Sequence, residues 1–374
     1  MTLFRNSVRD WNTARWRGVI LQGLGLGICA VALWWLARNT ASNLDQRGIS
    51  VGFEFLRQPA NFAIGEAWVR YSPDDTLARA ILVGLANTAI VSVLGWMLAT
   101  VFGFVVGLLR LSRNPVLDGL LRGAVDFVRN IPLLLLLLFL AATMHSLPSP
   151  RNALEPVSGV ILSDRGLILA YPGLTTLHAV LALVLVGTLL LRTRLGRRGW
   201  WVVAGAAGAL AVALSIVPPS WRSPHLEGFN FVGGVTFSPE FAALLFALVL
   251  HHGAHISEVV RGAVLAVPQR QWDAAAALGL SRFQATRLVV LPQAIRAMVP
   301  LLANNCVSLT KNSSLAVAIG FPDVVSVLNT TANQTGHAVE TMLIMILVYL
   351  ALSLAVAAAL NSYNRRILRH GVAG

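Results

Sequence analysis

The chain has 374 residues, of which 56% are hydrophobic and 12% are charged. Soluble domains carry about 25% charged residues, so this composition excludes an ordinary soluble enzyme and indicates a polytopic membrane protein. The formal net charge of +13 does not indicate a nucleic-acid partner, because the arginines are scattered among long apolar runs, and Cys29 and Cys306 lie inside apolar stretches, which excludes a disulfide framework.

Apolar runs long enough to cross a bilayer recur along the whole chain. A membrane-spanning helix needs about 20 mostly apolar residues. Eight segments meet this requirement: 18–37, 80–109, 126–146, 174–191, 199–218, 240–257, 296–320 and 339–361. The sequence therefore predicts an all-α, polytopic membrane helical bundle of about eight transmembrane helices, embedded in the lipid bilayer.

The arginines give this bundle an orientation, because loops on the cytoplasmic side are enriched in arginine and lysine. With the N-terminus inside, the cytoplasmic segments hold 20 arginines and the outer segments hold eight. An even number of spans places both termini in the cytoplasm. The net positive charge is thus interpreted as an orientation signal.

The spans divide the chain into four parts. Residues 1–79 form an anchor helix and an outer loop, and residues 80–146 form a first group of core helices. Residues 147–239 form a further helix pair between proline-rich outer loops. Residues 240–374 form the remaining core helices with a long cytoplasmic loop, about 261–295. The Gly103–Gly107 and Gly23–Gly27 spacings fit closely packed helices, and chance in a glycine-rich chain is the alternative.

The cytoplasmic loop carries the strongest local signals. Pro268 suits the first turn of a short helix, and a run of four alanines favours its continuation to about Leu278. Gly279 can end this helix in a left-handed conformation.

A second short helix is predicted after this glycine. Ser281 and Gln284 form a possible capping box, and the helix runs to about Val290. Pro292 is expected to break or kink the chain before the next span. The first helix presents a face of small residues, which fits either a docking element for another protein or an ordinary connecting loop. The residues alone leave both interpretations open.

The spacing of this loop resembles the "EAA" loop of ATP-binding-cassette importer permeases. The matching residues are Asp273-Ala274-Ala275, Gly279, Val289 and Leu291-Pro292. Aspartate stands at 273 where the family has glutamate, and valine at 289 where it has isoleucine. The resemblance implies a coupling helix in which Asp273, Ala274, Ala275 and Gly279 contact a separate cytoplasmic ATPase subunit.

Further segments resemble the polar amino-acid subfamily of these permeases, and the extended layout resembles the long permeases of general L-amino-acid importers of Gram-negative bacteria. The segments are Gly84–Thr88, Arg129–Pro132, Glu258–Gly262 and Leu309–Leu315. The resemblance implies a type I permease core in the cell inner membrane. It also implies a periplasmic amino-acid-binding protein that delivers L-amino acids, and a second permease subunit that is usually a different chain.

The chain has no Gly-x4-Gly-Lys-Ser/Thr phosphate loop, so ATP hydrolysis is expected in a separate subunit rather than here. An ion- or proton-coupled secondary transporter is the alternative. Such transporters place ionisable groups within their spans, whereas most acidic residues here fall in predicted loops or at helix ends. An intramembrane enzyme is a weaker alternative, because the chain lacks the Gly-x-Ser-x-Gly and His-Glu-x-x-His patterns.

Polar residues inside the spans are the candidates for the substrate pathway, because such residues normally face a bundle interior or a wet cavity. Helical spacing places Asn305, Ser308 and Asn312 on one face, overlapped by a stripe that includes Asn304 and Lys311. Lys311 is the single lysine of the chain, and both a substrate contact and a structural ion pair are open for it. Asn87, Thr88 and Ser92 form a smaller patch on the second span.

Two other clusters receive structural interpretations. His251, His252 and His255 could suggest a metal, but without suitable partners they are assigned to packing, and no metal or cofactor is predicted. Glu258 and Arg261 lie one helical turn apart and are expected to pair locally.

Overall fold

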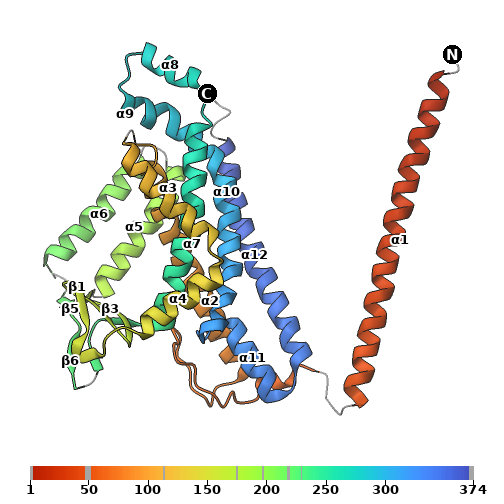
Figure 1. Ribbon diagram of the computed structural model, residues 1–374, viewed down its shortest axis with the longest axis horizontal. Coiled ribbons are helices and arrows are strands. Elements are labelled where there is room, and N and C mark those ends of the chain that lie inside the picture. Colours follow the sequence, from red (N-terminus) through yellow and green to blue (C-terminus); the bar gives the residue numbers. More distant parts are fainter. Residues whose placement is uncertain are drawn as a thin grey trace.

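The computed structural model in Figure 1 describes residues 3–46, 52–112, 114–173, 176–195, 198–216, 220–228 and 230–369. Its α-helices are α1 (Leu3–Gln46), α2 (Leu77–Leu109), α3 (Pro115–Asn130), α4 (Leu133–His145), α5 (Thr176–Leu195), α6 (Arg198–Ile216), α7 (Pro239–Leu265), α8 (Gln269–Ala277), α9 (Arg282–Ala285), α10 (Leu291–Asn312), α11 (Val324–Thr335) and α12 (Ala338–Arg369). Shorter turns are the 3-10 helices η1 (Glu54–Arg57), η2 (Pro150–Asn152) and η4 (Ser313–Ile319), and the π-helix η3 (Thr286–Val290). The mostly helical architecture is as predicted.

Five helical segments in the described residues are long and apolar enough to cross a membrane. They are Gly18–Thr40, Leu77–Leu109, Pro239–Leu265, Arg282–Ile319 and Ala338–Leu360. They coincide with five of the eight predicted spans. The apolar part of α6, Trp200–Ser215, is shorter, so the two spans predicted within 147–239 and the total of eight stay predictions.

The third predicted span, 126–146, is not one straight helix. α3 ends at Asn130, α4 begins at Leu133, and the two helices meet at an angle of 101°. Pro132 cannot donate a backbone hydrogen bond and disfavours the helical conformation at the residue before it. Ile131 accordingly has an extended backbone, with φ −83° and ψ 127°. The segment predicted as the third span is therefore bent sharply at this point, and its crossing of the membrane stays a prediction.

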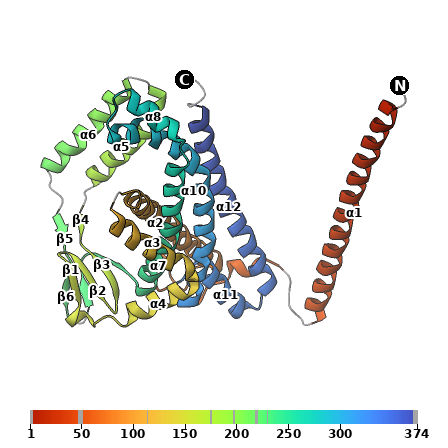
Figure 2. The same cartoon turned by 45° about the horizontal axis from the view of Figure 1, so that its top comes forward.

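The centre of the molecule is the contact between α2 and α7. Fully buried Val91 and Ala99 on α2 belong to the same apolar cluster as Leu248 and Ile256 on α7. A Cβ atom at Gly103 would lie 2.6 Å from Ile256 Cβ, so the glycine is what lets the two backbones approach. This confirms the close packing predicted for Gly103, whereas a Cβ atom at Gly23 or Gly27 would meet no atom within 4 Å. By contrast, α1 lies apart from the bundle in Figures 1 and 2.

The segment 147–239 contains strands that the sequence analysis did not predict. They are β1 (Leu154–Val157), β2 (Val160–Ser163), β3 (Gly166–Leu169), β4 (Tyr171–Gly173), β5 (Ser220–Arg222), β6 (His225–Glu227), β7 (Asn230–Val232) and β8 (Val235–Phe237). An antiparallel sheet has the order β1-β2-β3-β8, so the α5–α6 hairpin is inserted between two neighbouring strands. In Figure 2 these strands lie at the end of the molecule opposite α8.

The ends of the outermost helices lie on the same side of the molecule as the predicted cytoplasmic loop. In Figure 1 the start of α1 and the end of α12 lie at the same end of the molecule as α8 and α9. That end is the cytoplasmic side in the orientation that the arginines indicate. The side of the membrane itself stays a prediction from charge.

Candidate functional site

The first short helix predicted in the cytoplasmic loop is present as α8 and is closed at its C-terminal end by a glycine. Gly279 has φ +73°, a conformation that side chains with a Cβ disfavour. The Leu280 N–H donates to the Ala275 carbonyl at 3.1 Å, and the Gly279 N–H donates to the Ala276 carbonyl at 2.9 Å. These two bonds form a Schellman motif, which satisfies the last carbonyls of α8. The glycine therefore sets where α8 ends and how the chain turns towards α9.

The four residues for which the family resemblance implies contact with the ATPase subunit differ in their exposure to solvent. Asp273, Ala274 and Gly279 are exposed, whereas Ala275 is 2% exposed. Asp273 Oδ1 accepts a hydrogen bond from Gln269 Nε2 at 3.1 Å within the same helix. The outer face of α8 is thus open to a partner, and Ala275 holds the inner face against the bundle.

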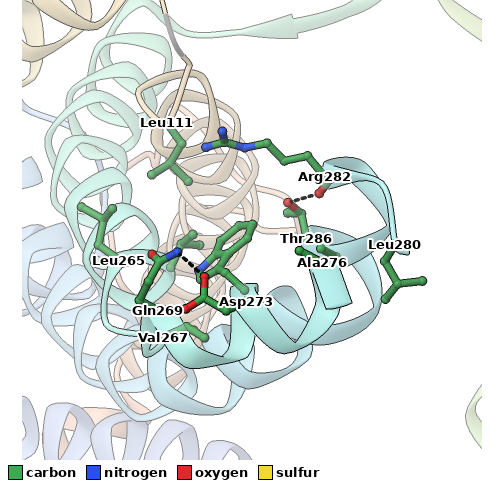
Figure 3. A pocket seen from close by; sticks show the side chains of 12 residues that line it. Leu111, Leu265, Val267, Gln269, Asp273, Ala276, Leu280, Arg282 and Thr286 are labelled. Carbon is green, nitrogen blue, oxygen red and sulfur yellow. Dashed lines mark hydrogen bonds between the residues drawn. The ribbon is translucent and has the colours of Figure 1, made fainter. Parts of the chain in front are cut away.

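A pocket of about 550 Å³ lies between α8, α9 and the end of α7 (Figure 3). The Arg282 guanidinium lies 6.0 Å from the centre of the Trp272 ring, a cation–π distance that links α9 to α8. Gln293 Nε2 also donates to Gln271 Oε1 at 3.4 Å, which links α8 to the start of α10. Two side-chain contacts therefore connect α8 to the helical segment that continues into α10.

The second helix of the loop begins as predicted but does not end where expected. Ser281 and Gln284 form the predicted capping box, with Ser281 Oγ accepting from the Gln284 N–H at 3.3 Å. The helix then continues through the π-turn η3 into α10, so the chain does not break before the span, and a π-turn stands where a break or kink was predicted. The Leu291 N–H donates to the Thr286 carbonyl, a step of five residues. This wide turn accommodates Pro292, which would otherwise interrupt a regular α-helical ladder.

Two of the predicted pathway residues meet at a histidine. His252 Nδ1 lies 2.8 Å from Asn305 Oδ1, and His252 Nε2 lies 3.2 Å from Asn312 Nδ2. His252 is 3% exposed and lies on α7. The face shared by Asn305 and Asn312 is therefore directed at a neighbouring helix. Sequence reasoning missed this role of His252, because its partners lie 53 and 60 residues away in the chain.

The overlapping stripe on α10 is open. Asn304, Ser308 and Lys311 are exposed, and Lys311 lines a pocket of about 470 Å³ together with Ser314 and Tyr349. Among the described residues, no carboxylate lies within ion-pair distance of Lys311. The structure therefore divides the predicted pathway residues of α10 between a face engaged with α7 and an open face.

The patch on α2 is buried and joins backbone segments. Asn87 Nδ2 donates to the Glu66 carbonyl at 2.7 Å and to the Pro322 carbonyl at 2.9 Å. Thr88 Oγ1 accepts from the Val324 N–H at 3.0 Å. These contacts hold α2 against the segment before it and against the start of α11. The geometry favours a structural role for Asn87 and Thr88.

Beside this patch, Asp323 carries a buried carboxyl group that caps α11. Its Oδ1 accepts from the Ser326 N–H at 2.8 Å, its Oδ2 lies 3.5 Å from the Tyr349 hydroxyl, and the residue is 1% exposed. Burial raises the pKa of Asp323 to about 7. The folded state therefore binds a proton more tightly than the unfolded chain.

Asp323→Asn should remove part of the pH dependence of stability. Because the pKa of the folded state exceeds the usual 3.8, wild-type stability should fall as the pH rises from about 4 to about 7. Asparagine is an equally good N-cap and carries no charge. We expect a higher melting temperature than wild type at pH 8 and a flatter curve between pH 5 and 8. The exposed variant Asp74→Asn should follow the wild-type curve, and a parallel shift of the Asp323 variant at every pH would contradict the assignment.

Glu258 is the centre of an ion-pair cluster that joins three helices. Its Oε1 lies 2.7 Å from Arg110 Nη1 and 3.6 Å from Arg129 Nη1. The Arg110 side chain is 1% exposed. The expected local pair with Arg261 is replaced by these contacts to the ends of α2 and α3. Arg110 was not identified from the sequence, where it is one of several arginines at the end of a span.

His251 and His255, the two other histidines of the predicted cluster on α7, pack against each other. The His251 and His255 rings lie 4.9 Å apart in an edge-on arrangement. Within the described residues, no group of three histidine, cysteine, aspartate or glutamate side chains is placed to hold a metal ion. We assign no metal to this cluster.

Comparison with known proteins places the chain in a family. The family described as binding-protein-dependent transport system inner membrane component matches residues 99–369. The chain is 37% identical to the general L-amino acid transport system permease protein AapQ of Rhizobium johnstonii, over 97% of this chain and 94% of that protein. It is 41% identical to the putative amino-acid ABC transporter permease protein YhdX of Escherichia coli, over 89% of each chain.

A third relative is the glutamate/glutamine/aspartate/asparagine transport system permease protein BztB of Rhodobacter capsulatus. The chain is 34% identical to it, over 97% of this chain and 96% of that protein. Membership of such a family implies an ATPase subunit, another permease subunit and a binding protein as partners. The chain therefore belongs to the family of binding-protein-dependent transport inner membrane components, as a multi-pass permease of the ATP-binding-cassette importers in the cell inner membrane.

Proposed function

We propose that this permease moves L-amino acids, delivered by a periplasmic binding protein, and that a separate ATPase subunit hydrolyses the ATP. The three relatives all carry amino-acid transport in their names, and AapQ and BztB match almost the whole chain. Family membership favours this ATP-driven importer over the ion-coupled alternative.

The observation that carries the proposal is the exposed outer face of α8. Ala274 and Gly279 offer small surfaces to a partner, while Ala275 and Trp272 hold the helix against the bundle. The ATPase would dock on this face. Its closure would then move α8, and the contacts to Arg282 and Gln293 would transmit the motion into α10. ATP can drive transport in this way only if it binds one conformation of the complex better than the other.

The substrate path would follow the open stripe of α10. Ser308 offers a hydroxyl group, and Lys311 offers an ammonium group that suits the carboxylate of an amino acid. A charged side chain on a membrane-spanning helix needs a wet path or another protein beside it, because exposure to lipid is costly. We propose that the second permease, a different chain, covers this face and completes the path.

The test is reconstitution of the complete transporter in lipid vesicles with its ATPase, partner permease and binding protein. We expect ATP hydrolysis to be stimulated by binding protein loaded with an L-amino acid, and the amino acid to accumulate inside. The matched control is binding protein without substrate. Uptake that follows an imposed ion gradient without ATP would overturn the proposal.

Lys311→Met should slow substrate uptake without changing the assembly of the permease with its ATPase. Methionine keeps most of the length and the apolar character of the side-chain stem but loses the charge, so we expect slower uptake with an unchanged amount of assembled complex. One lost charge-assisted hydrogen bond is worth about 1.5–3 kcal/mol, or roughly a ten- to hundredfold change. Wild-type uptake kinetics in this variant would remove Lys311 from the path.

A further inference from the structure

We infer that His252 is a positioning residue of the transport path: it clamps α10 to α7 and thereby decides which polar face of α10 the substrate meets. The inference rests on the proposed function. It concerns a residue that none of the sequence patterns singled out for transport.

The clamp uses both nitrogens of one ring. In the neutral imidazole one nitrogen donates and the other accepts. The contacts are satisfied when Nδ1–H donates to Asn305 Oδ1 at 2.8 Å and Nε2 accepts from Asn312 Nδ2 at 3.2 Å. The opposite proton placement would set an acceptor against the Asn305 oxygen. The ring is 3% exposed, so water cannot replace either partner at low cost.

The two asparagines lie two helical turns apart on the same face of α10. Because one ring holds both amides, neither a rotation of α10 nor a shift along its axis can preserve the pair of contacts. The clamp therefore stabilises one register of α10 against α7. Asn305 and Asn312 are occupied in that register, which leaves the stripe of Ser308 and Lys311 as the face available to substrate.

The clamp is also connected to α8, because α8 contacts the helical segment that carries both asparagines. The helical segment Arg282–Ile319 runs without interruption from the cytoplasmic loop past both asparagines. A force applied at α8 must therefore act on the His252 contacts if it turns or shifts α10. The free-energy difference between the clamped and unclamped registers then contributes directly to the coupling between ATP hydrolysis and transport.

His252→Phe tests the clamp, because phenylalanine keeps an aromatic ring and removes both nitrogens. In the reconstituted transporter we expect basal ATP hydrolysis to rise by at least about fivefold, and the amount of amino acid taken up per ATP to fall by a similar factor. The matched control is His255→Phe, one turn further along α7, which should keep the wild-type ratio of stimulated to basal hydrolysis. A wild-type ratio in the His252 variant overturns the inference.

Two further variants guard against a simple folding defect. Asn312→Leu removes only one of the two contacts of His252, so we expect a basal rate between those of wild type and His252→Phe. If the phenylalanine variant fails to assemble, a wild-type ratio in the Asn312→Leu variant overturns the clamp. In an assembled complex, Asn305→Leu combined with His252→Phe should couple no worse than His252→Phe alone, and additive losses would also overturn it.

The outcomes also separate this inference from the proposed function. If the wild-type complex does not couple hydrolysis to amino-acid uptake, the proposed function fails. If the wild-type complex couples and the His252 variants couple equally well, only the clamp fails.

Discussion

Glu258→Gln is expected to destabilise the permease by about 3–5 kcal/mol, because it removes the carboxylate that neutralises a buried arginine. The Arg110 side chain is 1% exposed and lies 2.7 Å from Glu258. Glutamine has nearly the same shape as glutamate, so packing is preserved and the loss reports the charge. The measurement is thermal unfolding of the purified protein in detergent.

The matched control for this variant is an ion pair on the surface. Asp118 and Arg122 lie 2.9 Å apart, but the Arg122 side chain is 54% exposed. Asp118→Asn should change the free energy of unfolding by less than about 0.5 kcal/mol. Equal melting temperatures for wild type and Glu258→Gln would show that Arg110 finds another partner and that Glu258 does not hold α2, α3 and α7 together.

Ala274→Trp should weaken binding of the ATPase subunit strongly while leaving the permease folded. Ala274 is exposed on the outer face of α8, so the free energy of unfolding should change by less than about 0.5 kcal/mol. An indole on the docking face would prevent close approach. Such overpacking costs about 1–3 kcal/mol or more, which weakens the complex by roughly ten- to hundredfold. Co-purification of the ATPase and its stimulated hydrolysis are the measurements.

Two variants of the same helix control this experiment. Ala274→Ser keeps the side chain small, so it should bind the ATPase like wild type. Ala275→Trp changes a residue that is 2% exposed and should destabilise the permease itself. If Ala274→Trp retained the ATPase at wild-type affinity, α8 would not be the docking element.

The sequence predicted the parts of the molecule whose causes are local. Hydrophobic length located five of the spans, since crossing a bilayer is a property of one segment at a time. The left-handed Gly279 and the Ser281–Gln284 capping box were predicted because each depends on residues within one or two helical turns. The spacing of the coupling loop then indicated the family.

Two prolines shape the chain differently from the predictions, for reasons that are partly local. The 101° bend at Pro132 follows from the proline itself, whereas hydrophobic length alone predicted a span there because a long apolar run follows the proline. At Pro292 the opposite happened, because a single π-turn absorbed the proline without ending the helix. A proline marks a position where a helix can be interrupted. The local backbone then determines whether the helix breaks, as at Pro132, or continues, as at Pro292.

Only the tertiary structure decided which polar residues share a site. On the sequence, Asn305, Ser308 and Asn312 were one face of a helix, with Lys311 on an overlapping stripe, and Asn87 and Thr88 were further candidates for the same cavity. In the structure His252 holds Asn305 and Asn312, backbone groups hold Asn87 and Thr88, and Ser308 and Lys311 stay open. Helical periodicity determines which residues lie on one face, but packing against other helices determines what each face meets. That information resides in contacts between residues more than 50 positions apart, such as those of His252 with α10.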